Sequence, residues 1–128
     1  MNLNNLTLKT QEAIQTAQQY AFEKKHPQIE DEHLFYGLLE VDRNVVPFLF
    51  NKLDVDIEIL KGLNSKSLDK FSKVEGSTQM ISQKASKTLM NAVSIAKKQK
   101  DEFVAAEHLL ISLLDSSSSV SKMMLDNG

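Results

Sequence analysis

The sequence predicts an all-α domain built from two copies of one helical repeat. Its 128 residues contain only four glycines and two prolines, too few turn residues for a many-stranded sheet. Apolar residues recur at helical spacing in most segments. The chain also aligns with itself after a shift of 75 positions. Its length suits a single domain, residues 1–128, with a core that needs no disulfide or metal.

The first four helices follow from local signals. Thr7 is a candidate N-cap for the first, which should end before His26-Pro27 because the residue preceding proline disfavours helical geometry. A second helix is expected at about 31–41 from its apolar periodicity. Asn44 is expected to cap a short third helix, and a fourth should begin near Asp56.

The pattern then starts again after a connector at 69–80. A long helix is expected from Ser82 or Gln83, followed by a loop at 100–102 and an apolar helix around Leu109 to Leu114. A serine run at 116–119 predicts a turn before a last helix that carries Val120 and Leu125.

The internal repeat is the strongest signal. Between the pairs Lys9–Lys84 and Leu53–Gly128, ten of 45 positions are identical, where about three are expected by chance. Glu32-His33-Leu34 aligns with Glu107-His108-Leu109. We therefore predict two pseudo-twofold-related four-helix repeats, at about 6–68 and 81–128. The fourth helix of the second repeat would start near 131, so we expect this repeat to lack it here and an intact parent protein to continue with it.

Composition argues against several classes of function. The net charge is −2 and the lysines are scattered, which disfavours nucleic acid as a partner. Without cysteine there is no disulfide or thiolate metal site. No apolar run is long enough to cross a membrane, and no signal peptide is recognisable. The chain lacks a Gly-x-x-x-x-Gly-Lys-Ser/Thr loop and any nucleophile–base constellation, so we expect no enzyme.

Several motifs together resemble the Clp N-terminal domain, and within it the ClpB-type disaggregases. Leu6-Thr7 followed by 9–13 is similar to the family's opening helix. Val74-Glu75-Gly76 resembles the ClpB branch more than the ClpC branch. Asp101 to Val104, followed by Glu107-His108-Leu109, matches the family's second repeat. The resemblance covers essentially the whole chain.

This resemblance implies a role in a larger machine. Such domains sit on a hexameric ATPase ring, weakly capture exposed apolar segments of unfolded or aggregated proteins, and pass them to the ring's pore. ATP and magnesium would bind only in downstream modules, and this domain would need no cofactor. A cytoplasmic location, a coiled coil in the parent and a co-chaperone system of the heat-shock-70 type are implied too. The alternative is an adaptor-docking or phosphoarginine-binding domain of the ClpC or ClpA type.

The family resemblance also selects substrate-binding residues. It maps that role onto Thr7, Asp101 and Glu107, with Glu32 as the repeat partner of Glu107. A groove between the first helices of the two repeats is expected near Leu89, next to Met90.

Each polar candidate also has a structural interpretation. Thr7 can simply cap a helix, Glu32 and Glu107 can simply stabilise positive helix ends, and Asp101 can be a solvated turn residue. His33 and His108 occupy equivalent positions but lack metal-ligand spacing, so structural histidines are expected there.

Overall fold

The computed structural model describes residues 5–76 and 78–115, which form six helices and one pair of very short parallel strands. The elements are, in chain order, α1 (Leu8–Glu23), β1 (Gln28–Ile29), α2 (Asp31–Val41), α3 (Val45–Lys52), α4 (Ile57–Asp69), β2 (Met80–Ile81), α5 (Gln83–Lys98) and α6 (Ala106–Leu114). The all-α class is confirmed, and the strand pair is an addition that the sequence did not predict. The expected last helix around 120–125 lies outside the described residues.

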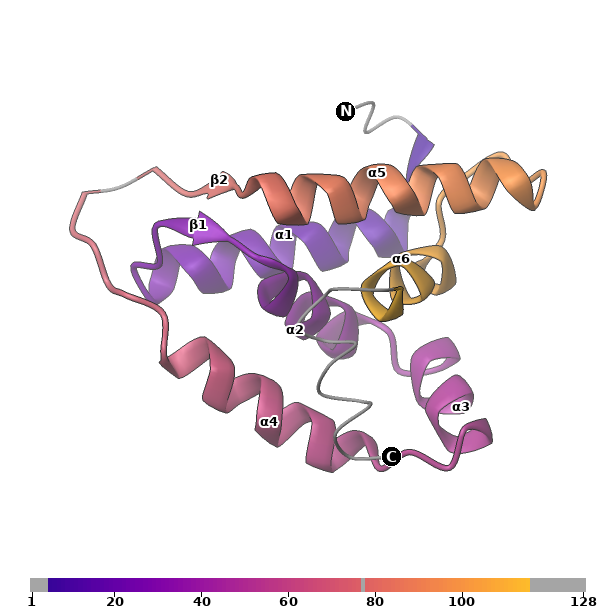
Figure 1. Cartoon of the computed structure of the whole chain (residues 1–128), viewed down its shortest axis with the longest axis horizontal. Coiled ribbons are helices and arrows are strands. Elements are labelled where there is room, and N and C mark those ends of the chain that lie inside the picture. Colours follow the sequence, from indigo (N-terminus) through magenta and orange to yellow (C-terminus); the bar gives the residue numbers. More distant parts are fainter. Residues whose placement is uncertain (1–4, 77, 116–128) are drawn as a thin grey trace.

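The helices form three layers (Figure 1). α1 and α5 lie on one side, α2 and α6 in the middle, and α3 and α4 on the other side. The middle layer is apolar on most of its surface, which is why Leu34, Phe35, Leu38, Leu109 and Leu113 are almost completely buried there. No described helix has the length and hydropathy that a membrane span requires.

The predicted repeat is visible in the backbone. Ile29 pairs with Ile81 in the strand pair, and Leu6 pairs with Val104 in an isolated parallel bridge. Under the 75-position shift, Ile29 of the first repeat corresponds to Val104 of the second, and Leu6 corresponds to Ile81. Exchanging the two repeats therefore converts the pair of Ile29 and Ile81 into the pair of Val104 and Leu6. The two bridges are therefore related by a twofold exchange of the repeats.

The helix ends repeat in the same way. Thr7 and Ser82 each accept a hydrogen bond from the backbone N–H three residues later, at 3.2 and 3.0 Å. Lys25 and Lys100 both adopt positive φ, at 59° and 61°. Because such geometry is uncommon for residues other than glycine, its recurrence at matching positions supports the duplication strongly.

A glycine allows the close crossing of α1 and α2. A Cβ at Gly37 would overlap the carbonyl oxygen of Ala13, so no larger residue fits without a shift of backbone. The corresponding position in α6 is Ser112, whose hydroxyl instead donates to the carbonyl of Thr88 at 2.6 Å. The crossing of α1 and α2 therefore depends on a glycine, whereas the equivalent crossing of α5 and α6 contains a serine hydrogen-bonded to the facing helix.

One predicted cap is wrong. Asn44 makes no side-chain cap at α3. Asp42 Oδ1 accepts from the backbone N–H groups of Asn44 and Val45, at 2.9 and 3.0 Å. α4 begins after Asp56 as expected, and Asp56 caps it by accepting from Glu58 N at 2.9 Å.

Candidate functional site

The bridge between Leu6 and Val104 brings the two repeats together at one end of the domain. Thr7 N donates to Val104 O at 3.0 Å, and Val104 N donates to Asn5 O at 2.7 Å. The start of α1 therefore lies against the loop that leads into α6. We call the surface formed there by Thr7, Leu8, Asp101, Phe103 and Glu107 the Thr7 end.

Thr7 is a helix cap, as predicted. Its Oγ1 accepts from Thr10 N, and its hydroxyl lies 2.9 Å from Thr10 Oγ1. Thr10 Oγ1 donates onward to Val104 O at 2.9 Å, so the Thr7 hydroxyl hydrogen must be the one shared between the two threonines. The cap is thus tied directly to the second repeat, and capping and contact with a ligand are compatible.

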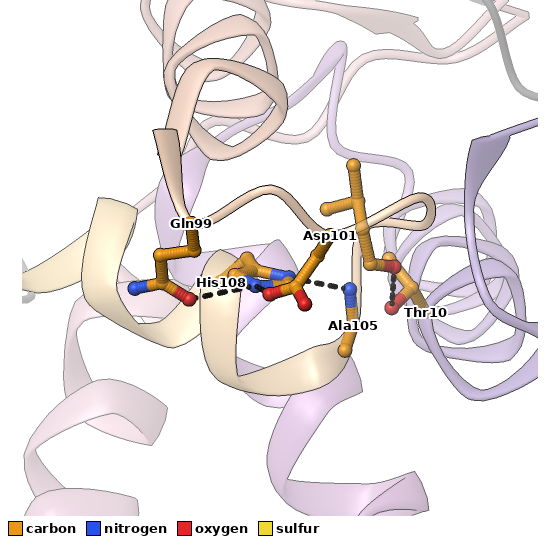
Figure 2. Close-up of polar contacts among 6 residues, drawn as sticks. Thr10, Gln99, Asp101, Ala105 and His108 are labelled. Carbon is orange, nitrogen blue, oxygen red and sulfur yellow. Dashed lines mark hydrogen bonds and ion pairs between the residues drawn. The ribbon is translucent and has the colours of Figure 1, made fainter. Parts of the chain in front are cut away.

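Asp101 is more than a solvated turn residue. His108 Nδ1 accepts from Ala105 N at 2.8 Å, so in the neutral ring the proton lies on Nε2. That Nε2–H points at Asp101 Oδ2, 2.8 Å away, and at Gln99 Oε1, 3.1 Å away (Figure 2). His108 is fully buried, whereas 48% of the Asp101 side chain remains exposed. The histidine therefore fixes a carboxylate at the surface.

Apolar side chains lie beside these acids. Leu8 follows the Thr7 cap and is 71% exposed, and Phe103 precedes Val104 and is 45% exposed. Glu107 is exposed in the first turn of α6, two residues after Ala105, whose N–H donates to His108 Nδ1. The Thr7 end thus combines accessible apolar area with at least two carboxylates.

Glu32 lies at the opposite end of the domain, where Ile29 pairs with Ile81 in the β1–β2 strand pair. The two bridges are separated by the length of α1, about 24 Å for 16 residues. We call the surface formed here by Gln28, Glu32 and Gln83 the Glu32 end; His26 and Ser82 are buried there. Here Gln28 and Gln83 occupy the positions of Phe103 and Leu8, and buried His26 occupies the position of exposed Asp101. The structure therefore does not bring Glu32 together with the other predicted site residues.

The histidines of the Glu32 end form a buried pair. His33 Nδ1 accepts from Glu30 N at 2.9 Å, so its Nε2–H faces His26 Nδ1, 2.8 Å away. Burial, and next the positive charge that His26 would carry, lower the pKa of His33 to about 4. His33 also stacks on Phe71, with ring centroids 5.3 Å apart. In the described part of the chain no three potential ligands gather to hold a metal ion, and both repeat histidines have structural partners.

The structure corrects the expectation for Leu89. Its side chain is only 3% exposed and packs in the core cluster that includes Ile14 and Ala17, so it is not available on the surface. Met90 is 62% exposed, because consecutive helical residues point about 100° apart. Leu89 therefore does not line an exposed groove.

An open cleft lies elsewhere along α1. It has a volume of about 430 Å³ and lies between the second half of α1 and the chain before β2, with walls that include Gln15, Gln18, Phe22 and Gln79. The sequence did not indicate this cleft, because only the pairing of β1 with β2 brings Gln79 next to α1.

Comparisons with known proteins agree with this geometry. Residues 5–127 match the family described as the Clp repeat (R) N-terminal domain. The chaperone protein ClpB of Bacteroides thetaiotaomicron is 34% identical over 128 residues, which cover 100% of this chain and 15% of that protein.

Solved structures share the fold. The Hsp104 N-terminal domain from Candida albicans superposes with a TM-score of 0.87 at 20% identity, covering 97% of this chain and 82% of that one. A ClpV N-domain solved in complex with a VipB peptide gives 0.79 at 14% identity, covering 96% and 78%.

Proposed function

Because the chain belongs to the Clp repeat N-terminal domain family and is of the ClpB type, we propose that it binds exposed apolar segments of unfolded or aggregated polypeptides. The chain spans about 15% of the length of the curated relatives that it matches. We propose that the parent is a cytoplasmic homohexameric disaggregase whose downstream modules bind ATP and magnesium. In this proposal a co-chaperone system of the heat-shock-70 type delivers clients, and the N-terminal domain itself is not catalytic.

The observation that carries the proposal is the composition of the Thr7 end. Leu8 and Phe103 come from different repeats, are largely exposed, and lie on either side of the backbone bridge that joins those repeats. Burying apolar area against a client lowers the free energy in proportion to the area removed from water. Exposed apolar residues beside polar ones are typical of surfaces that bind other proteins.

The carboxylates would add selectivity. Asp101 is oriented by His108, and Glu107 is exposed nearby, so both can attract lysine or arginine residues that flank an apolar client segment. The Glu32 end offers glutamines at the matching positions and is expected to bind such segments less well. Weak binding would suffice, because several copies on one ring raise the effective concentration of sites near the pore.

A structural relative supports a polypeptide as the ligand. The ClpV N-domain, which shares this fold, was solved with a bound peptide. The rival proposal, an adaptor-docking or phosphoarginine-binding domain, is less well supported. Asp31, next to Glu32, is buried and bonded to Thr88 Oγ1 at 2.7 Å, and a carboxylate there would repel a phosphate group.

The test compares matched surface variants. An unfolded, carboxymethylated model protein is titrated into the wild-type domain and into Phe103→Ser and Phe48→Ser variants. Phe48 is the control, because it is also exposed but lies on α3. We expect Phe103→Ser to weaken binding about fivefold or more, as the loss of a buried aromatic contact does, and Phe48→Ser to leave it unchanged. Equal effects of the two variants would argue against the Thr7 end, and binding of phosphoarginine instead would favour the rival.

A further inference from the structure

A second cavity lies in the first repeat, next to the Glu32 end, because Asn64 in its wall donates to Glu32 O and the Tyr20 ring lies 6.1 Å from that of His26. It has a volume of about 220 Å³ and is formed by residues of α1, α2 and α4, among them Tyr20, Tyr36, Leu39, Lys61, Asn64 and Leu68. Three helices from one repeat therefore enclose a space about the size of one large side chain.

The walls of this cavity are aromatic and apolar. The rings of Tyr20 and Tyr36 lie with centroids 4.4 Å apart at an angle of 45°, and Leu39 and Leu68 are buried leucines beside them. An aromatic ligand can contact the face or edge of such a tyrosine pair, and this geometry contributes beyond the area that it buries.

Polar atoms around the cavity lack partners. Asn64 is 2% exposed, and its Nδ2 donates to Glu32 O at 3.0 Å, but its Oδ1 makes no hydrogen bond with any described residue. Neither tyrosine hydroxyl is joined by a hydrogen bond to another residue of the described segments. Of these atoms only Asn64 Oδ1 is buried, whereas Tyr20 and Tyr36 are half-buried, so their hydroxyl oxygens can accept a hydrogen bond from a ligand in the cavity.

The charges at the rim are already paired, so they favour a neutral ligand over an ionic one. Lys61 lies 3.6 Å from Glu58, and Glu40 lies 3.9 Å from Arg43, so both ion pairs are already formed. Lys61 would repel an arginine or lysine side chain, and Glu40 would repel a carboxylate. A neutral, planar ring with one N–H fits these walls best. A phenyl ring would make no hydrogen bond with the tyrosine hydroxyls, and an aliphatic chain would use the tyrosine faces poorly.

We propose that this cavity, which we call the Tyr20–Tyr36 pocket, binds the indole ring of a tryptophan in a client polypeptide, with its N–H donated to a tyrosine hydroxyl oxygen. This inference rests on the proposed polypeptide-binding function and names an anchor residue that such clients would carry. The second repeat has Ile95 and Ile111 at the positions of Tyr20 and Tyr36, so only the first repeat offers this aromatic pair.

The experiment uses N-acetyl-tryptophanamide as the probe. The chain contains no tryptophan, so the probe's fluorescence reports its binding without background. We expect saturable binding with a dissociation constant of about 1 mM, and binding about fivefold weaker for the N1-methylated indole, which has lost the donor. Ser65 lies exposed at the cavity rim, so Ser65→Leu should fill the space without unfolding α4 and abolish binding. Ile111→Ala, at the repeat position of Tyr36, is the matched control and should bind as the wild type does.

Several results would overturn this inference. One is that the domain does not bind the probe at about 10 mM. Another is that the methylated probe binds as tightly as the unmethylated one. A third is that the Ser65→Leu and Tyr36→Leu variants both bind the probe as tightly as the wild type does. A pair of unfolded peptides that differ only by tryptophan or leucine separates the two proposals. We expect the tryptophan peptide to bind about fivefold more tightly, and Ser65→Leu to remove only that difference. If both peptides bind equally at the Thr7 end, the pocket is refuted while the proposed function stands.

Discussion

Acidification should destabilise the domain through the buried histidine pair. In the folded state His33 has no acceptor position left for a proton, since Nδ1 receives Glu30 N–H and Nε2–H faces His26. A proton on His33 would have to displace the backbone N–H that it caps. Burial, and next the positive charge that His26 would carry, lower the pKa of His33 to about 4, well below the value near 6.5 of an unfolded histidine. The pKa of His26 is lowered as well, first by burial and next by Lys73.

The sign and size follow from linkage. Because the folded pKa is depressed, the unfolded chain binds more protons between pH 6.5 and 4, and the free energy of unfolding falls as the pH falls through that window. For His33 alone, the loss is about 2 kcal/mol at pH 5 and about 3 kcal/mol when the transition is complete. Asp69 opposes this effect weakly by raising the pKa of His26, while Lys24 reinforces it.

The assay is urea denaturation at several pH values between 7.5 and 4.5, on the wild type and on His26→Asp. That substitution copies the second repeat, where Asp101 faces His108. The carboxylate would accept the His33 Nε2–H and favour the charged ring, so the variant should lose less stability between pH 6.5 and 5. A wild type whose stability is flat across this range, or a variant with the same slope as the wild type, would refute the reasoning.

Other substitutions test the packing and the site. Leu89→Ala should cost about 2–5 kcal/mol in urea unfolding, whereas Met90→Ala should change stability by less than about 0.5 kcal/mol; similar values would mean that the assignment of core and surface is wrong. Gly37→Ala should cost about 3 kcal/mol or more, because its Cβ meets a backbone carbonyl, and a neutral effect would show that α1 and α2 can separate. Thr7→Ala should cost about 1 kcal/mol as a lost cap, and Thr7→Ser should restore the stability. Glu107→Lys should leave the melting temperature within a few degrees but weaken the binding of unfolded polypeptide. A large loss of stability without a binding defect would mean that Glu107 only stabilises the positive end of α6.

Local signals predicted most of the helices and the duplication. The cap at Thr7, the second helix at 31–41 and the start of α4 at Asp56 all depend on side chains close in sequence, which explains why they were predictable. The 75-residue shift was also visible, because the core positions of both repeats keep their character. Asn44 failed as a cap because Asp42, two residues earlier, reaches the same N–H groups.

Site geometry was less predictable because it depends on contacts between the repeats. Periodicity places Leu89 on an apolar face but cannot tell whether a second helix covers that face. Likewise, Asp101 looked like an ordinary turn residue until the fold placed the Nε2–H of His108 against it. The 75-residue shift already pairs Gln28 with Phe103, but only the fold shows that Phe103 is exposed beside the bridge between Leu6 and Val104.

The most direct test of the central claim maps a bound polypeptide onto the labelled domain residue by residue. An unfolded peptide with an apolar centre and lysine flanks is titrated while the amide chemical shifts are followed. We expect the shift changes to concentrate at Leu8, Asp101 and Phe103, with little change at Gln83 and Gln28, the counterparts of Leu8 and Phe103. Equal shifts at both ends of the domain, or none at the Thr7 end, would contradict it.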